Sequence, residues 1–332
     1  QTTTSLLPMA RATGNLRIVT DAMVKSVETD GEHRATGVTF VDRTTGADVS
    51  LDARVVVLAA SACETARILL NSKSEQFPEG LANSSGQVGR NLMDSTGVSF
   101  VTHIPALEGR PRYNEDGNTS NHLFIPWWGH EAQARGELDF PRGYHFELGG
   151  GFGAPNMGIG AIAEGHGAEL RESVQRKYGA YVGLSLRGEM VASDACFMEI
   201  DPTTQDQWGI PVPRFHWKWS EHELRQVAHG QKTAKAIIET MGGEMRNPDL
   251  PPEQAIKKGG EIIHEVGTTR MGSNRAESVT NEWGQTWDVP NLYVMDGGVF
   301  ASNPHKNCTL TIMTLAMRNA DRLSDALERG EV

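Results

Sequence analysis

Apolar and polar positions alternate along much of the first fifty residues, a pattern that indicates β-strands. Three short runs are rich in β-branched side chains and are separated by glycine-containing turns. These runs are residues 22–28, 35–41 and 48–52. They predict a three-stranded antiparallel meander. The segment LRIVT at 16–20 predicts a further strand, and a short helix ending near Gly14 is expected before it.

A different pattern follows at residues 54–60, RVVVLAA, where the apolar positions are continuous. Such a run is typical of a parallel strand that is buried on both faces. Small residues and then the helical sequence of 64–71 come next, an order that lets a ligand approach the backbone at Ala59 and Ser61. Residues 291–298 predict a second buried strand, which ends in an Asp-Gly turn.

Residues 96–262 show weaker periodicity and more aromatic side chains. Several runs alternate, which predicts an antiparallel sheet with one face toward a cavity. The strand candidates are residues 97–104, 122–128, 143–149, 180–190 and 195–200. Residues 220–242 predict the clearest helix, because Ser220 and Glu223 have the spacing of a capping box and the apolar positions repeat at helical intervals.

Aromatic and glycine-rich positions in this middle region have two interpretations. Trp127, Trp128 and segment 141–150 are candidates for an aromatic platform that receives a sugar, and packing in the core is the alternative. The run GGGFG at 149–153 is interpreted as a loop, since no buried strand precedes it.

The composition limits the kind of protein. The chain has 332 residues, enough for one or two domains, and its net charge of −11 argues against nucleic-acid binding. No run of 18 apolar residues occurs, so no membrane-spanning helix is expected. Its three cysteines lie far apart and predict neither a disulfide framework nor a metal site.

The stretch from His264 to Thr311 carries the strongest chemical signal. It begins with HEVGTTRMG, continues through NLYVMDGGVF and ends with NPHKNCTLTI. In this order the three segments resemble the C-terminal signature of the glucose–methanol–choline (GMC) family of flavin oxidoreductases. Segment 141–151, PRGYHFELGGG, resembles the sugar-acting members, particularly the bacterial glucoside 3-dehydrogenase type and other pyranose-oxidising members.

The resemblance implies a catalytic pair. His264 stands at the position of the family's catalytic base, and Asn307 stands at the position of its partner. A neutral histidine suits the removal of a hydroxyl proton, and an amide N–H stabilises a developing alkoxide. His305, two residues from Asn307, is the alternative partner.

The resemblance also implies FAD as the cofactor, which takes a hydride from the alcohol. In the family a residue at the position of Val24 touches the adenine, and an ordinary core role is the alternative here. The backbone of Asp296 and Gly297 is expected near the phosphate and ribityl groups, unless Asp296 only forms a turn. A helix that begins at Cys308 or Thr309, directly after Asn307, would direct its positive end toward the flavin.

The predicted fold class is α/β with α+β elements, in three segments. Residues 1–95 are expected to form the later part of an FAD-binding domain, 96–262 a substrate-binding domain with an antiparallel sheet and helices, and 263–332 the catalytic segment with a returning strand and helix of the FAD domain. No G-x-G-x-x-G fingerprint occurs, and Ser61 stands where the family usually has glycine. We therefore expect the nucleotide-binding part of the domain to lie in an N-terminal segment or a separate chain, and this polypeptide alone to bind FAD weakly or not at all.

Two functions of different class follow. The first is flavin-dependent oxidation of an alcohol, expected to be a secondary hydroxyl of a sugar or glycoside, by a complete protein that works with or without an electron-transfer subunit. The second is a binding module that keeps the GMC scaffold without flavin and without catalysis. The intact His264 and Asn307 positions favour the first, and the missing fingerprint favours the second.

Overall fold

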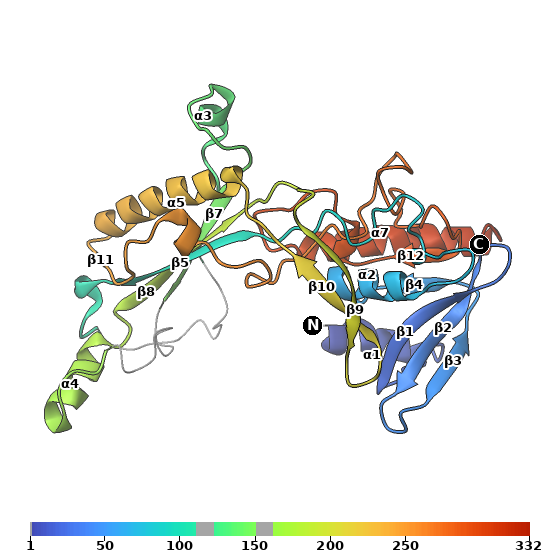
Figure 1. Cartoon of the computed structure of the whole chain (residues 1–332). Coiled ribbons are helices and arrows are strands. Elements are labelled where there is room, and N and C mark those ends of the chain that lie inside the picture. The colour runs from blue at the N-terminus through green and yellow to red at the C-terminus, as the bar shows by residue number, and fades with distance from the viewer. Residues whose placement is uncertain (1, 111–122, 151–161) are drawn as a thin grey trace.

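The computed structural model describes residues 2–110, 123–150 and 162–332. Figure 1 shows two lobes, with β1 to β4, β12 and α7 in one and β5, β7, β8 and α5 in the other. The described elements form a mixed α/β structure, which confirms the predicted fold class. The division of the chain after residues 95 and 262 stays a prediction.

A three-stranded antiparallel meander forms part of the first lobe, as predicted. Its strands are β1 (Ala22–Thr29), β2 (Ala35–Asp42) and β3 (Asp48–Asp52). Before them, α1 (Leu6–Ala12) has Thr13 as its C-cap residue and is followed by Gly14, whose φ of 74° is the left-handed conformation that terminates helices. The prediction of a strand at 16–20 is wrong, because this exposed segment pairs with no strand among the described residues.

Two parallel strands bring distant parts of the chain together. β4 (Val56–Leu58) pairs with β12 (Leu292–Val294), which confirms a parallel arrangement. The prediction that both faces are buried is wrong, since Val57 is 42% exposed between two buried neighbours. An apolar run is continuous in the sequence here although no described element covers one of its faces.

The buried side chain of Asn291 fastens this parallel pair to the meander. Its amide nitrogen donates to the carbonyl oxygens of Ala35 and Arg54 at 2.7 and 2.8 Å, and its oxygen accepts the Ala35 N–H at 2.8 Å. Helices α2 (Ala62–Asn71) and α7 (Thr309–Glu328) lie beside the pair (Figure 1).

The second lobe contains the predicted antiparallel sheet. Its strand order is β11-β5-β8-β7-β6, and every neighbouring pair is antiparallel. The strands are β5 (Thr96–His103), β6 (Leu123–Ile125), β7 (Tyr144–Gly150), β8 (Tyr181–Gly188) and β11 (Glu244–Met245). Trp127 is buried in the core of this lobe, whereas Trp128 is half exposed.

Helix α5 (Glu221–Thr240) packs on this sheet and confirms the predicted capping box. The Ser220 N–H donates to Glu223 Oε2 at 2.9 Å, so both ends of the box are formed. Gly230 allows the close approach, because a Cβ there would lie 1.9 Å from Leu186 Cδ1.

The fifth strand candidate forms a strand, but not in this sheet. β9 (Phe197–Gln205) pairs only with β10 (Pro211–His216) among the described strands. Arg67 of α2 fixes the ribbon to the first lobe, since its guanidinium donates to Pro211 O at 2.8 Å and to Asp206 Oδ2 at 2.7 Å. Part of the glycine-rich run 149–153 lies outside the described residues.

Short elements complete the described fold. They are η1 (Thr2–Thr4), η2 (Pro105–Leu107), α3 (His130–Ala134), α4 (Gly167–Lys177), α6 (Pro252–Ala255) and η4 (Gly297–Val299).

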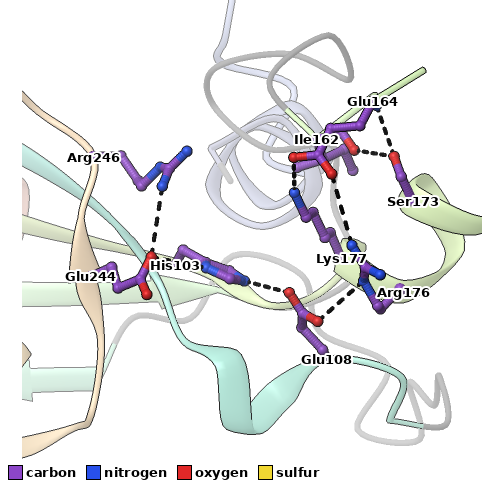
Figure 2. Close-up of polar contacts among 9 residues, drawn as sticks. All are labelled: His103, Glu108, Ile162, Glu164, Ser173, Arg176, Lys177, Glu244 and Arg246. Carbon is purple, nitrogen blue, oxygen red and sulfur yellow. Dashed lines mark hydrogen bonds and ion pairs between the residues drawn. The ribbon is translucent and has the colours of Figure 1, made fainter. Parts of the chain in front are cut away.

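Charged side chains cross-link the end of the second lobe that carries α4 (Figure 2). His103, the last residue of β5, lies 2.8 Å from Glu108, which also pairs with Arg176 of α4 at 3.2 Å. Glu164 pairs with Lys177, and hydrogen bonding to this ammonium lowers the pKa of the Glu164 carboxyl. These contacts fasten α4 to β5 at a partly exposed surface.

Candidate active site

The segments 264–271 and 296–299 lie side by side, although three turns and strand β12 separate them in sequence. Three N–H groups of the first segment donate to carbonyl oxygens of the second, at 2.9 to 3.1 Å. Gly267 sits at the crossing with a φ of 97°, and a Cβ there would lie 2.3 Å from the Asn91 oxygen. Only glycine fits this position.

The buried carboxylate of Asp94 fixes the turn that carries His264. Its Oδ1 accepts the N–H groups of Ser95 and His264 at 2.7 and 3.0 Å, and its Oδ2 accepts the Gly260 N–H at 3.0 Å. Burial raises the pKa of Asp94, and these hydrogen bonds oppose that shift. The same turn holds Ile263 at a φ of 61°, which is rare for a β-branched residue.

The His264 ring is held from both sides. Its Nδ1 lies 3.2 Å from Ser95 Oγ, and its Nε2 lies 3.3 Å from Asn307 Nδ2. Because an amide N–H donates, Nε2 carries the lone pair and Nδ1 carries the proton. Ser95 Oγ then accepts that proton's hydrogen bond and donates its own to the Pro304 oxygen, 3.5 Å away. The arrangement presents a neutral imidazole whose basic nitrogen faces Asn307.

Burial lowers the pKa of His264 below its ordinary value of 6.5, because the charged form loses hydration. The negative charge of Asp94 opposes this shift, and the positive charge of Arg187 adds to it. A lowered pKa keeps the ring neutral and able to accept a proton at neutral pH.

The structure separates Asn307 from His305, the alternative partner. Asn307 faces His264, whereas His305 Nδ1 lies 3.1 Å from His145 Nδ1 on strand β7. Among the described residues the geometry therefore pairs His264 with Asn307, in the register predicted from the sequence.

Asp296 and Gly297 stand at the carboxyl end of β12. The Asp296 carboxylate is buried and accepts the Thr65 hydroxyl at 2.5 Å and the Gly298 N–H at 2.7 Å. Burial raises the pKa of Asp296. These bonds and the N–H groups of the turn before α2 oppose that shift without cancelling it. The carboxylate thus organises the turn after β4, and its oxygens are used within the protein.

Ala59 and Ser61 lie in that turn with exposed backbone. Ser61 has φ 90° and ψ 161°, a conformation that is natural for glycine and strained for other residues. The serine therefore adopts the backbone that the family's glycine would adopt. Strain of this kind is typical of sites where a backbone approaches a ligand.

Cys308 and Thr309 stand at the start of α7, as predicted. Cys308 is the N-cap residue but makes no side-chain cap, so the first N–H groups of this 20-residue helix are not capped by it. Thr309 is exposed, and α7 also exposes Leu310, Met313 and Met317. Such an end favours a ligand that carries acceptor oxygens or negative charge.

Val24 lies on β1 opposite Phe40 and packs, partly buried, against the hydrophobic core under α2. This position is compatible with the core role that was the alternative for this residue. Its contact with adenine stays a prediction.

The residues present fit a flavin. Ser61 has a strained backbone, the start of α7 is not capped by the Cys308 side chain, and α7 exposes apolar side chains in its first turns. Among the described residues, Ala59 and Ser61, the Asp296–Gly297 turn and the 307–309 segment would hold the cofactor.

Comparison with known protein families identifies the chain. A model described as GMC oxidoreductase, N-terminal part, matches residues 1–96, and the model of the C-terminal part matches residues 192–316. The chain belongs to the GMC oxidoreductase family. Both matches confirm the resemblance found in the three C-terminal segments, and FAD is the cofactor that they indicate.

Curated relatives include several enzymes named for the alcohols or sugars that they oxidise. The chain is 32% identical to 2-methyl-1,2-propanediol dehydrogenase of Mycolicibacterium austroafricanum, over 92% of this chain and 54% of the relative. It is 27% identical to the C-glycoside 3-oxidase of Arthrobacter globiformis, over 88% of this chain and 50% of the relative. It is also 27% identical to the fructose dehydrogenase large subunit of Gluconobacter japonicus, over 95% and 55%.

Solved structures agree on the fold. A formate oxidase from Aspergillus oryzae RIB40 matches with a TM-score of 0.67 at 17% identity, over 96% of this chain and 62% of that one. The chain spans about half the length of the curated relatives that it matches. No helix within the described residues is long and apolar enough to cross a membrane.

Sequence reasoning missed four residues beside the site. Ser95 was not singled out, Arg187 appeared only within a strand candidate, and His145 and Glu147 appeared only within a strand candidate and the candidate sugar-binding segment 141–150. His145 and Glu147 of β7 meet Arg187 of β8 through sheet pairing, which sequence spacing does not reveal. Alternation in β7 was the available signal, because His145 and Glu147 lie two residues apart on one face.

Proposed function

We propose that the complete protein oxidises an alcohol, with His264 as the base and FAD as the hydride acceptor. The observation that carries this proposal is the geometry of the His264 ring, whose lone-pair nitrogen lies 3.3 Å from the Asn307 amide. A substrate oxygen placed beside this pair, within hydrogen-bonding distance of both nitrogens, would meet a proton acceptor and a hydrogen-bond donor together.

The chain's own residues perform the proton chemistry. His264 Nε2 takes the hydroxyl proton, while the Asn307 N–H donates to the oxygen from which it leaves. The imidazolium that results keeps its Nδ1–H bond to Ser95, and the carboxylates of Asp94 and Glu147 favour its charge. When bound, FAD accepts the hydride that leaves the carbon bearing this hydroxyl group.

The substrate class proposed is a sugar or glycoside, oxidised at a secondary hydroxyl. Relatives named for a diol, a C-glycoside and fructose support a polyhydroxylated substrate. Relatives named as a large subunit and as a flavoprotein support an electron-transfer partner subunit. The nucleotide-binding part of the FAD domain is proposed to come from outside residues 1–332, since the family's fingerprint is not in this sequence.

Anaerobic bleaching of the flavin in the complete protein tests the substrate class. Methyl glucosides should reduce the flavin faster than choline or simple aliphatic alcohols at equal concentration. The reverse ranking would reject a sugar substrate while leaving alcohol oxidation in place. Failure of every alcohol would reject oxidation itself.

A further inference from the structure

A pair of histidines, His145 and His305, lies next to the site formed by His264 and Asn307. His145 is fully buried on β7, with its Nδ1 3.1 Å from His305 Nδ1 and its Nε2 3.3 Å from Glu147 Oε1. Arg187 of β8 pairs with the same carboxylate at 3.9 Å. The pair is joined to the site through Ser95, whose hydroxyl contacts both His264 and the carbonyl of the residue before His305.

The hydrogen-bond partners assign a donor or acceptor role to each ring nitrogen. A carboxylate only accepts, so the His145 Nε2 that faces Glu147 carries a proton. With both rings in the neutral form, His145 has a bare Nδ1, which accepts from His305 Nδ1–H. Neutral His305 is left with a bare Nε2. Within residues 2–110, 123–150 and 162–332, no hydrogen bond to this nitrogen is formed.

The surroundings keep His305 in this form. Its ring is partly buried, and burial together with the neighbouring His145, Lys306 and His130 lowers the pKa of His305 to about 4. His305 is therefore a neutral hydrogen-bond acceptor at neutral pH, and it is oriented by a chain that ends in a buried ion pair.

We propose that His305 Nε2 accepts a hydrogen bond from a second hydroxyl of the substrate, adjacent to the hydroxyl engaged by His264. The inference rests on the proposed function and specifies it further. A bare ring nitrogen selects a donor and repels the oxygens of an anion. The Lys306 ammonium, 3.7 Å above the Phe124 ring, disfavours a cationic donor at the same place. A neutral hydroxyl is the donor that remains, so the site distinguishes a diol or sugar from an alcohol with one hydroxyl.

A cycle of protein and substrate changes tests this contact. The complete protein and its His305→Ala variant are compared on methyl glucoside and its monodeoxy analogues by anaerobic flavin reduction. For the wild type, removing the contacted hydroxyl should lower kcat/KM about tenfold, mostly through KM. His305→Ala should lose about tenfold on the full substrate and nothing further on that one analogue. His305→Gln, whose amide oxygen accepts, should recover part of the loss.

His222→Ala is the matched control, because this histidine is exposed on α5 and should behave as wild type on every analogue. Equal discrimination of the analogues by His305→Ala and wild type would overturn the proposal. So would an equal fall of kcat on all analogues, which is what a merely structural role predicts. Neither result bears on whether the wild type oxidises alcohols at all.

A measurement without turnover separates the two proposals. Nitrogen-15 NMR of labelled histidines should find the proton of His305 on Nδ1 and that of His145 on Nε2. Methyl glucoside should shift the His305 Nε2 resonance but leave the control His222 unchanged. A proton on His305 Nε2, or no shift at saturating glycoside, overturns the inference even if the protein oxidises no alcohol.

Discussion

Two networks built from the same three residue types lie at opposite ends of strand β5. The buried network is His145, Glu147 and Arg187. The other is His103, Glu108 and Arg176 (Figure 2), and it is called the exposed network because Glu108 and Arg176 are partly exposed, although His103 is buried. Register places Arg187 opposite Gly97 at one end of β5 and His103 at the other. Eight residues of strand separate the two ends by roughly 23 Å.

The exposed network has the shorter contacts, but the side chains of the buried network are less exposed to solvent. The histidine–carboxylate distance is 2.8 Å in the exposed network and 3.3 Å in the buried network. Side-chain exposure runs the other way, at 24% and 55% for Glu108 and Arg176 against 7% and 18% for Glu147 and Arg187. Distance alone would therefore rank the two networks in the wrong order.

The difference shows where electrostatic free energy is concentrated. Water screens the exposed contacts, so each contributes little to stability. The buried charges lose hydration when the protein folds, and they depend on one another once they are buried. A network that is costly to assemble and that lies beside His264 is compatible with a functional role, whereas the exposed network serves to fasten α4.

Removal of the carboxylate should give the largest difference in stability between the two networks. Glu147→Ala should lower the free energy of unfolding by about 3 kcal/mol or more, because it leaves Arg187 and His145 buried without their partner. Glu108→Ala should cost less than about 1 kcal/mol. Urea denaturation of the complete protein measures both, with Glu147→Gln as the variant that keeps a hydrogen-bond acceptor. Equal losses for Glu147→Ala and Glu108→Ala would contradict the comparison.

Catalysis should depend on the end of β5 where the buried network lies. Asn307→Ala should slow flavin reduction on the order of tenfold to a thousandfold, since it removes the donor to the substrate oxygen but leaves His264 in place. Glu108→Ala, at the exposed end, should stay within about twofold of wild type. Anaerobic stopped-flow absorbance measures both rates. A wild-type rate for Asn307→Ala would remove Asn307 from the proposed mechanism.

The acid side of the stability curve should also reflect the buried network. Since the folded-state pKa of His305 is about 4 and its ordinary value is 6.5, the unfolded chain binds the proton first as pH falls. The contribution of neutral His305 is therefore complete above pH 6.5 and is lost between about pH 6.5 and 4. Urea denaturation at pH 7 and pH 5 measures the free energy of unfolding of wild type and of His305→Gln. The stability of wild type relative to His305→Gln should be lower at pH 5 than at pH 7. A difference independent of pH would show that His305 titrates normally.

Salt should separate the two networks by the smallest margin. Raising the ionic strength from about 0.05 to 0.5 M should reduce the loss caused by Glu108→Ala by a few tenths of a kcal/mol. The loss caused by Glu147→Ala should hardly change, because ions do not enter the buried network. The same urea experiments at the two salt concentrations measure these effects. Equal salt sensitivity would show that water reaches both networks.

Local patterns predicted much of this fold. The alternation in 22–52 gave the meander, and the spacing of Ser220 and Glu223 gave the start of α5, because both depend on neighbours in sequence. A parallel strand at 54–60 and a strand at 291–298 were also predicted, but neither their pairing as β4 and β12 nor the exposed Val57 was. Burial depends on which element covers a face, and a run of apolar letters does not specify it.

The candidate site was predicted only in part. The family signature pointed to His264 and Asn307, whose side chains lie 3.3 Å apart, and the structure gives the reason for Gly267 between the two paired segments. The contact between His145 and His305 spans 160 residues and depends on the register of β7 against β8. No local pattern encodes this contact, so His145 appeared as a strand residue and His305 only as the alternative partner of His264.

The central claim is that His264 is the base, and one measurement tests it directly. In the complete protein, His264→Ala should reduce its flavin at least about a hundredfold more slowly than wild type under anaerobic conditions with methyl glucoside. Flavin content should be unchanged, and His222→Ala, an exposed histidine on α5, should keep the wild-type rate. Reduction of the His264→Ala flavin at the wild-type rate would contradict the account.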